Sequence, residues 1–195
     1  ALPGWRRVCW RVGLVDDPGE RKIHSSPIAL AGGWAVLTGV LAPLLLLAVP
    51  WPWPLLRPEV LDQVGHGLRA REGQLAALLS GALGMTLLGA VDDRYELRAT
   101  TKFAGQLVIA LLVAASGIRV TLFVPSAAFS YAVTVLWILT VTNAFNFMDN
   151  MNGLCAGLGA IAALGFGLAA ALQTQYLVAA LAFSVAGAVV GFLPC

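Results

Sequence analysis

Charge is scarce in this sequence. Asp, Glu, Lys and Arg make up 11% of the 195 residues, whereas a typical soluble domain has about 25%. Hydrophobic residues make up 59%, so a water-soluble fold would lack the polar side chains needed to cover its surface. The shortage of charge excludes an ordinary soluble domain and an intrinsically disordered chain.

Cysteine and net charge are low as well. The three cysteines, Cys9, Cys155 and Cys195, are an odd number without a CxxC spacing. They exclude a disulfide-rich scaffold and are best interpreted as small apolar side chains. A net charge of +2 is too small for a polyanion-binding surface. We therefore predict no nucleic-acid partner.

Long stretches of the chain carry no charge at all. A helix that crosses a bilayer core needs about 20 mostly apolar residues, each adding about 1.5 Å. We predict an all-α polytopic membrane protein in which residues 1–195 form a single membrane domain and residues 1–27 form a cytoplasmic segment. About six transmembrane helices are expected, at residues 28–49, 74–91, 101–118, 127–142, 154–172 and 176–193.

The basic residues predict an orientation in the membrane. Six alternating spans place residues 1–27, 92–102 and 143–153 on one side, and the loops at residues 50–73 and 119–125 on the other. The first side carries eight of the 12 Lys and Arg residues, and the second carries four. Because cytoplasmic loops are enriched in Lys and Arg, the first side is predicted to be cytoplasmic.

Three polar clusters fall on this predicted cytoplasmic side. The first, GLVDDPGERKIH at residues 13–24, contains Arg21, Lys22 and His24. These side chains can donate hydrogen bonds to phosphate. An ordinary charged loop before a membrane helix explains the same pattern equally well.

The second cluster is a pair of adjacent carboxylates, Asp92 and Asp93, at the end of an apolar stretch. Such a pair is costly unless a cation compensates it, and carboxylate oxygens are ligands that Mg²⁺ prefers. Lys102 and Gln106 follow at the start of the next apolar stretch. The alternative interpretation is a water-exposed helix end.

The third cluster is NAFNFMDNMNGL at residues 143–154. Asn143, Asn146 and Asp149 are spaced by three residues and therefore share one helical face. A polar row between two apolar helices is expensive in lipid, so the row suits a nucleotide, a sugar or a metal. A polar turn capped by Asn152 and Gly153 is the alternative.

Together the three clusters resemble the motifs of the polyprenyl-phosphate N-acetylhexosamine-1-phosphate transferases of glycosyltransferase family 4. Residues 13–33 resemble the segment of the branch that transfers N-acetylglucosamine phosphate. Asp92 and Asp93 with Lys102 and Gln106 resemble the family's DD…K…Q signature, and residues 143–154 resemble its NA-N--DG-DGL segment. The three motifs occur in the family's order and cover most of the chain.

The resemblance implies transfer of N-acetylhexosamine 1-phosphate from a UDP-sugar to polyprenyl (undecaprenyl) phosphate, with release of UMP. This reaction begins cell-envelope glycan synthesis, such as that of lipopolysaccharide or teichoic acid. The implied setting is the bacterial inner membrane, with the active face in the cytoplasm and a homodimer as one form of assembly. The implied catalytic residues and Mg²⁺ ligands are Asp92, Asp93 and Asp149. The implied substrate-binding residues are Arg21, Lys22, His24, Lys102, Asn143, Asn146 and Asn152.

The chain also departs from the family pattern. Asn150 and Asn152 stand where the family has Gly and Asp, and an amide cannot act as a base. Further Asp- and His-bearing segments of the family are not in this sequence. We therefore expect a partial version of a ten- or eleven-helix fold, either a fragment or an inactive remnant. A transporter fragment is the other alternative, and it predicts acidic groups near the middle of a span.

Overall fold

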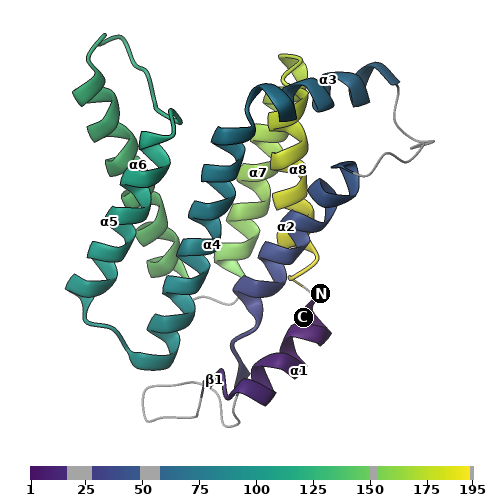
Figure 1. The fold of residues 1–195 in the computed structure, drawn as a ribbon. Coiled ribbons are helices and arrows are strands. Elements are labelled where there is room, and N and C mark those ends of the chain that lie inside the picture. The colour runs from purple at the N-terminus through teal and green to yellow at the C-terminus, as the bar shows by residue number, and fades with distance from the viewer. Residues whose placement is uncertain (17–27, 49–57, 150–152, 194–195) are drawn as a thin grey trace. The chain divides into compact units, whose positions relative to one another are not determined.

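The computed structural model describes residues 1–16, 28–48, 58–149 and 153–193 of the chain, and it is almost entirely helical (Figure 1). Two short antiparallel strands, which pair Val15 with Ala29, are the exception. The all-α class is therefore confirmed. The elements are α1 (Leu2–Val12), β1 (Val15–Asp16), β2 (Ile28–Ala29), α2 (Gly32–Ala48), α3 (Pro58–Ala70), α4 (Glu72–Tyr95), α5 (Ala99–Ala115), α6 (Ala127–Met148), α7 (Leu154–Leu172) and α8 (Tyr176–Val190).

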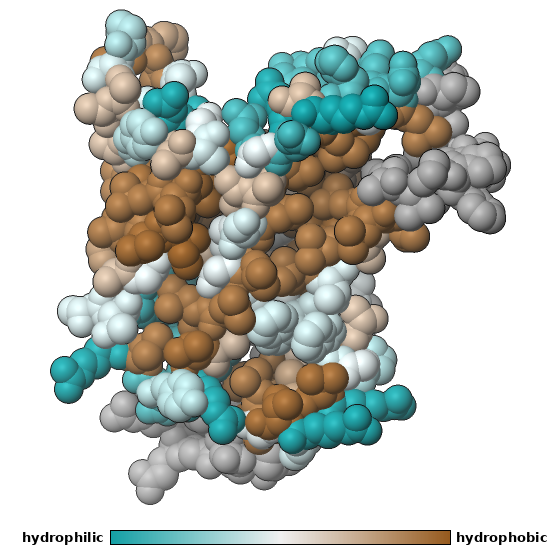
Figure 2. Space-filling view, viewed as in Figure 1, coloured by the Kyte–Doolittle hydropathy of each residue, from teal (hydrophilic) through white to brown (hydrophobic). Residues whose placement is uncertain are grey.

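Three of these helices, α4, α6 and α7, are long and apolar enough to cross a membrane. The helices α2, α5 and α8 are apolar but shorter, so each of the six predicted segments contains an apolar helix. Many large side chains on them face outward, including Trp137 at 62% and Ile161 at 69% exposure. Figure 2 shows broad hydrophobic areas over the helices, as a lipid environment requires. That all six cross the bilayer stays a prediction.

Residues 58–70 correct the predicted loop at residues 50–73, because they form the amphipathic helix α3. Apolar side chains recur every four residues at Val60, Val64 and Leu68, a helical spacing that the charge-based reading overlooked. Val64 is buried. A Cβ atom on Gly67 would lie 3.2 Å from Leu177, which shows that α3 packs closely on α8.

The described chain divides into two compact units. The α4–α6 unit contains Leu2–Trp34 and Ala76–Phe147, and the α7–α8 unit contains Ala35–Leu75 and the residues from Met148 onward. In the α7–α8 unit the two helices meet through small residues. A Cβ atom on Gly167 would lie 2.8 Å from the ring of Phe183, so only glycine fits there without a shift.

The α4–α6 unit also contains close helix contacts. A Cβ atom on Gly81 of α4 would lie 2.6 Å from Val113 of α5. Between α5 and α6 the buried contact is formed by Ala110, Ala114, Val135 and Leu139. In lipid, helices associate through this kind of close packing because the hydrophobic effect no longer favours helix contact over lipid contact.

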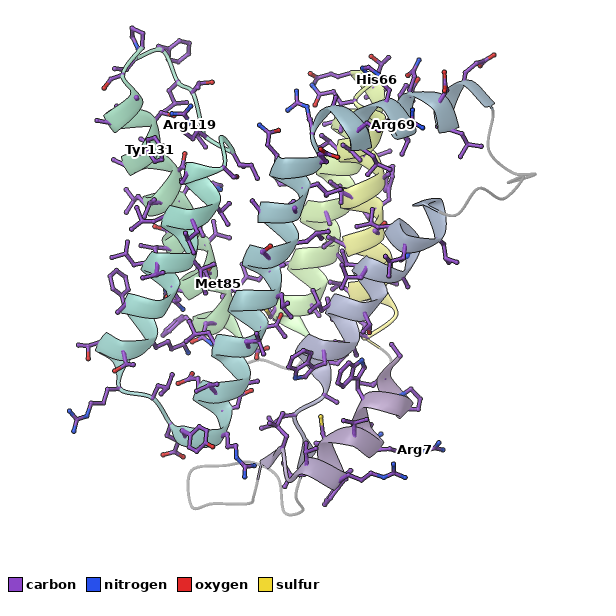
Figure 3. The ribbon with its side chains drawn as sticks, viewed as in Figure 1. Arg7, His66, Arg69, Met85, Arg119 and Tyr131 are labelled. Carbon is purple, nitrogen blue, oxygen red and sulfur yellow. The ribbon has the colours of Figure 1, made fainter. Side chains whose placement is uncertain are left out.

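The loop between α5 and α6 is fixed by polar contacts. Ser130 Oγ donates a hydrogen bond to the Val120 carbonyl at 2.8 Å, and the Val120 amide donates to Thr134 Oγ1 at 2.9 Å. The Arg119 guanidinium carbon lies 4.9 Å from the centre of the Tyr131 ring (Figure 3). One end of the α5–α6 hairpin is thereby closed, and its opposite end carries the candidate site.

Candidate active site

The contact between α5 and α6 changes from apolar to charged along its length. On α5, residues at four-residue intervals face this contact. They are Ala114, Ala110, Gln106 and Lys102. Because α6 runs antiparallel, its residues meet them in the opposite order, with Leu139 near Ala110, Asn143 at Gln106 and Asn146 at Lys102. The packing that joins the two helices therefore also positions their polar ends.

Lys102 connects three helices at this polar end. Its Nζ atom lies 2.7 Å from Asp92 Oδ2 of α4 and donates a hydrogen bond to Asn146 Oδ1 of α6 at 3.1 Å. The side chains of Lys102 and Asp92 are 23% and 20% exposed. This partial burial strengthens the ion pair relative to one in open water.

Gln106 and Asn143 form the next polar contact along the α5–α6 hairpin. Gln106 is only 3% exposed. Its Oε1 atom accepts a hydrogen bond from Asn143 Nδ2 at 2.8 Å, and Nδ2 also donates to the Leu139 carbonyl at 2.8 Å. Gln106 belongs to the DD…K…Q signature but was not assigned a role in binding or catalysis. Its four-residue interval from Lys102 was a further signal that could have placed it beside the site.

These side chains line a hollow of about 650 Å³. Its polar lining residues are Asp92, Thr100, Lys102, Asn143 and Asn146, and its apolar ones are Leu97, Ala99 and Phe103. The hollow therefore offers an anion, a cation and two amides within one unit of the protein. Four predicted residues from the second and third polar clusters meet here: Asp92, Lys102, Asn143 and Asn146.

The two residues that follow Asp92 differ in their surroundings within the α4–α6 unit. Asp93 is exposed and follows Asp92 in the last turns of α4. Arg94 donates a hydrogen bond from Nη1 to the carbonyl of Gly13 at 2.6 Å. This contact attaches the end of α4 to the turn after α1.

Within α1, burial raises the pKa of the Cys9 thiol, which keeps it protonated at neutral pH.

The other predicted residues fall outside the described part of the α4–α6 unit. Asp149 is exposed in the turn after α6 and belongs to the α7–α8 unit. Arg21, Lys22, His24 and Asn152 lie outside the described residues, as does the departing Asn150. Their predicted roles stay predictions.

The oxygen atoms at the hollow are of the kind that coordinate a hard cation. Across the described ranges, no three His, Cys, Asp or Glu side chains are grouped so that they could hold a metal ion. Asp92 and Asn143, which carry side-chain oxygens, nevertheless line one hollow. Mg²⁺ commonly binds through one or two carboxylates, several waters and the phosphates of its substrate. The residues therefore fit Mg²⁺ bound together with a phosphate.

Residues 75–195 match the family model described as Glycosyl transferase family 4. The chain belongs to this family. The matched range contains every residue of the hollow, from Asp92 to Asn146.

Several curated proteins with this family's activity in their names are similar to the chain. A Bacillus subtilis protein named as a probable undecaprenyl-phosphate N-acetylglucosaminyl 1-phosphate transferase is 30% identical over 96% of this chain and 49% of its own length. A Mycobacterium tuberculosis decaprenyl-phosphate N-acetylglucosaminephosphotransferase is 31% identical over 97% of this chain and 48% of its own. A Heliobacterium modesticaldum phospho-N-acetylmuramoyl-pentapeptide-transferase is 35% identical over 62% of this chain and 44% of its own.

The chain spans about half the length of these relatives. No solved structure matches it.

Proposed function

We propose that this membrane protein transfers N-acetylhexosamine 1-phosphate from a UDP-sugar to polyprenyl phosphate and releases UMP. The observation that carries the proposal is the position of Lys102, a half-buried cation held between Asp92 and Asn146 at a polar hollow. The names of the relatives support it, because they describe N-acetylglucosamine phosphate transfer to undecaprenyl or decaprenyl phosphate.

In the proposed reaction an oxygen of the lipid phosphate forms a bond to the β-phosphorus of the UDP-sugar. The bond from that phosphorus to the bridging oxygen breaks, and UMP leaves with the oxygen. Such a transfer needs positioned charge more than covalent help from the protein. Lys102 neutralises phosphate charge in the hollow, and Asp92 or Asp93 orients or deprotonates the lipid phosphate.

The amides and remaining polar residues hold the donor substrate in this proposal. Asn143, Asn146 and Asp149 bind the nucleotide sugar, together with Asn152, while Arg21, Lys22 and His24 bind phosphate. Asp92 and Asp93 would hold Mg²⁺, which would supply Lewis-acid stabilisation of the phosphate oxygens. The proposed setting is the cytoplasmic face of the bacterial inner membrane, where a soluble nucleotide sugar meets a lipid acceptor. A homodimer stays a prediction, which light scattering of the purified protein tests.

The position of Asp92 favours transfer over transport. Asp92 lies in the last turn of α4, three residues before the helix ends at Tyr95. An ion path instead predicts acidic groups near the middle of a span.

The deciding experiment measures release of UMP from UDP-N-acetylglucosamine in the presence of polyprenyl phosphate. Because the chain spans about half the length of its relatives, we expect little turnover from the 195 residues alone. A version extended with the C-terminal half of the Bacillus subtilis relative should be active. In that version Asp92→Asn should lower turnover by about 100-fold or more, as loss of a preorganised charge in an active site typically does.

Gln173→Ala, in the exposed turn between α7 and α8, is the matched control and should leave turnover unchanged. Asn152→Asp should be neutral or raise turnover. Full activity of an extended double variant that carries both Asp92→Asn and Asp93→Asn would refute the assignment of these carboxylates. An extended protein without activity would favour the inactive-remnant alternative.

A further inference from the structure

The side-chain amide of Asn143 is held in one orientation. The backbone carbonyl of Leu139 can only accept a hydrogen bond, so the Asn143 atom that lies 2.8 Å from it must be the nitrogen. Gln106 Oε1 accepts from the same nitrogen at 2.8 Å. Both hydrogens of the amide are therefore engaged, and Oδ1 is the polar atom of Asn143 that remains for a ligand.

We propose that Gln106 is a positioning residue that holds Asn143 with its Oδ1 atom facing the hollow. Asn143 lines the hollow, whereas Gln106 lies behind it in the α5–α6 contact. The inference rests on the proposed function, because it assigns Asn143 the role of a hydrogen-bond acceptor toward the substrate complex. The matching ligand is an electropositive group, either an N–H or O–H of the nucleotide sugar or a divalent cation bound with it.

Asn146 presents the opposite chemistry to the same hollow. Its Oδ1 atom already accepts a hydrogen bond from Lys102, which leaves its amide hydrogens as the groups available to a ligand. The two amides on one face of α6 are thereby distinguished, with Asn143 as acceptor and Asn146 as donor. Lys102 and Gln106, four residues apart on α5, impose this difference.

Gln106 is well suited to a fixed role. It is 3% exposed, and Ala110 and Ala114, which continue its row on α5, are both 0% exposed. A buried amide is costly unless it forms hydrogen bonds, so the contact with Asn143 contributes to holding both side chains.

The orientation itself is tested without any ligand. In the 15N-labelled 195-residue chain in nanodiscs, NMR follows hydrogen exchange of the Asn143 side-chain amide, assigned by its loss in Asn143→Asp. Gln106→Met removes the acceptor at similar volume, and exchange should become about tenfold faster, as expected for loss of one hydrogen bond. Gln106→Glu keeps an acceptor oxygen and should restore slow exchange. Unchanged exchange in Gln106→Met would overturn the proposal.

Binding then shows what Asn143 faces. The two probes are UDP-N-acetylglucosamine with EDTA, measured by calorimetry, and Mn²⁺ alone, measured by electron paramagnetic resonance. Gln106→Met should lower the affinity for the probe that contacts Asn143 by about tenfold. Gln106→Glu should restore that affinity. The thermal midpoint of each variant, with Gln173→Met as control, separates this effect from unfolding.

Two further outcomes are decisive. Equal weakening by Gln106→Met and Gln106→Glu would overturn the positioning role, because acceptor chemistry would then not matter. An extended wild-type protein that binds neither probe would overturn the proposed function, while the exchange measurement would still decide whether Gln106 orients Asn143.

Discussion

The α5–α6 and α7–α8 hairpins pack in the same manner but differ in what they bury. Both use small residues at the helix contact. The buried residues of α7 and α8 are all small, namely Ala160, Ala163, Gly167, Ala170, Ala179 and Ala186. The α5–α6 hairpin adds three buried polar side chains, Gln106, Ser130 and Thr134. Close apolar packing is thus enough to join two helices, and polar contacts are used where a specific register is required.

The polar residues of α5 and α6 are placed near the two ends of the hairpin. Thr134 and Ser130 bind the loop through Val120, and Gln106 binds Asn143 beside the hollow. In α8 the hydroxyl of Ser184 donates to the Ala180 carbonyl within its own helix. A hydrogen bond between elements resists sliding of one helix along the other, whereas a bond within a helix does not.

The largest effect should come from overpacking each hairpin. Ala110→Leu and Gly167→Leu both add bulk at a contact without space, since Ala110 is 0% exposed and Gly167 abuts Phe183. Each should lower the free energy of unfolding by about 1–3 kcal/mol, measured as a lower thermal midpoint in detergent. Only Ala110→Leu should also weaken UDP-N-acetylglucosamine binding. Equal binding loss in both variants would show that the site depends on overall stability and not on the α5–α6 contact.

An effect of about tenfold on cation binding is expected from Lys102→Met. Lys102 holds Asp92 with a positive charge, so its removal should increase Mn²⁺ affinity in the nucleotide-free chain about tenfold, the scale of one partly buried charge contact. Nucleotide-sugar binding should weaken in the same variant. Electron paramagnetic resonance and calorimetry measure the two changes.

Arg98→Met, which removes an exposed charge beside α5, is the control for the Lys102 experiment. It should leave both affinities nearly unchanged, because exposed charges are screened. Identical Mn²⁺ affinity in wild type and Lys102→Met would contradict a role for Lys102 as the counter-ion of Asp92.

The smallest expected effect on the free energy of unfolding distinguishes a hydroxyl that bonds to a separate element from one that bonds within its own helix. Thr134→Val keeps the shape of the side chain but removes the bonds to the Val120 amide and the Ser130 carbonyl. We expect a loss of about 1 kcal/mol in the free energy of unfolding. Ser184→Ala should cost less than about 0.5 kcal/mol, because its hydrogen bond lies within α8. Chemical unfolding in mixed micelles resolves the difference, and equal losses would contradict the distinction between the hairpins.

The helices could be predicted because charge and helix position are coupled in a membrane protein. Uncharged stretches located six apolar helices, and residues 154–172 were predicted with the bounds that α7 has. The helix α3 was missed because its charged residues, such as Asp62 and Arg69, hid an amphipathic period of four. Charge gaps detect helices surrounded by lipid and overlook helices with one polar face.

The polar hollow was only partly predictable. Asp92, Lys102, Asn143 and Asn146 stood out because polar residues are expensive beside apolar helices. Gln106 could not be assigned a role, because the sequence alone does not reveal which residue of α6 lies opposite it. The direction of the Asn143 amide depends on its contacts with the Leu139 carbonyl and Gln106, which only the structure supplies.

The unequal lengths of α4 and α5 affect the bilayer thickness that the two helices can match. At about 1.5 Å per residue, the 24 residues of α4 extend about 36 Å and the 17 residues of α5 about 25 Å, around a hydrocarbon core of about 30 Å. The contacts of Gly81, Gly84 and Gly105 prevent the two helices from adjusting independently. If α5 crosses the bilayer as predicted, lipid tails beside it would shorten locally, and the headgroup layer would lie closer to Lys102. Bilayer thickness thus becomes a determinant of how deeply a phosphate must enter the membrane to meet that side chain.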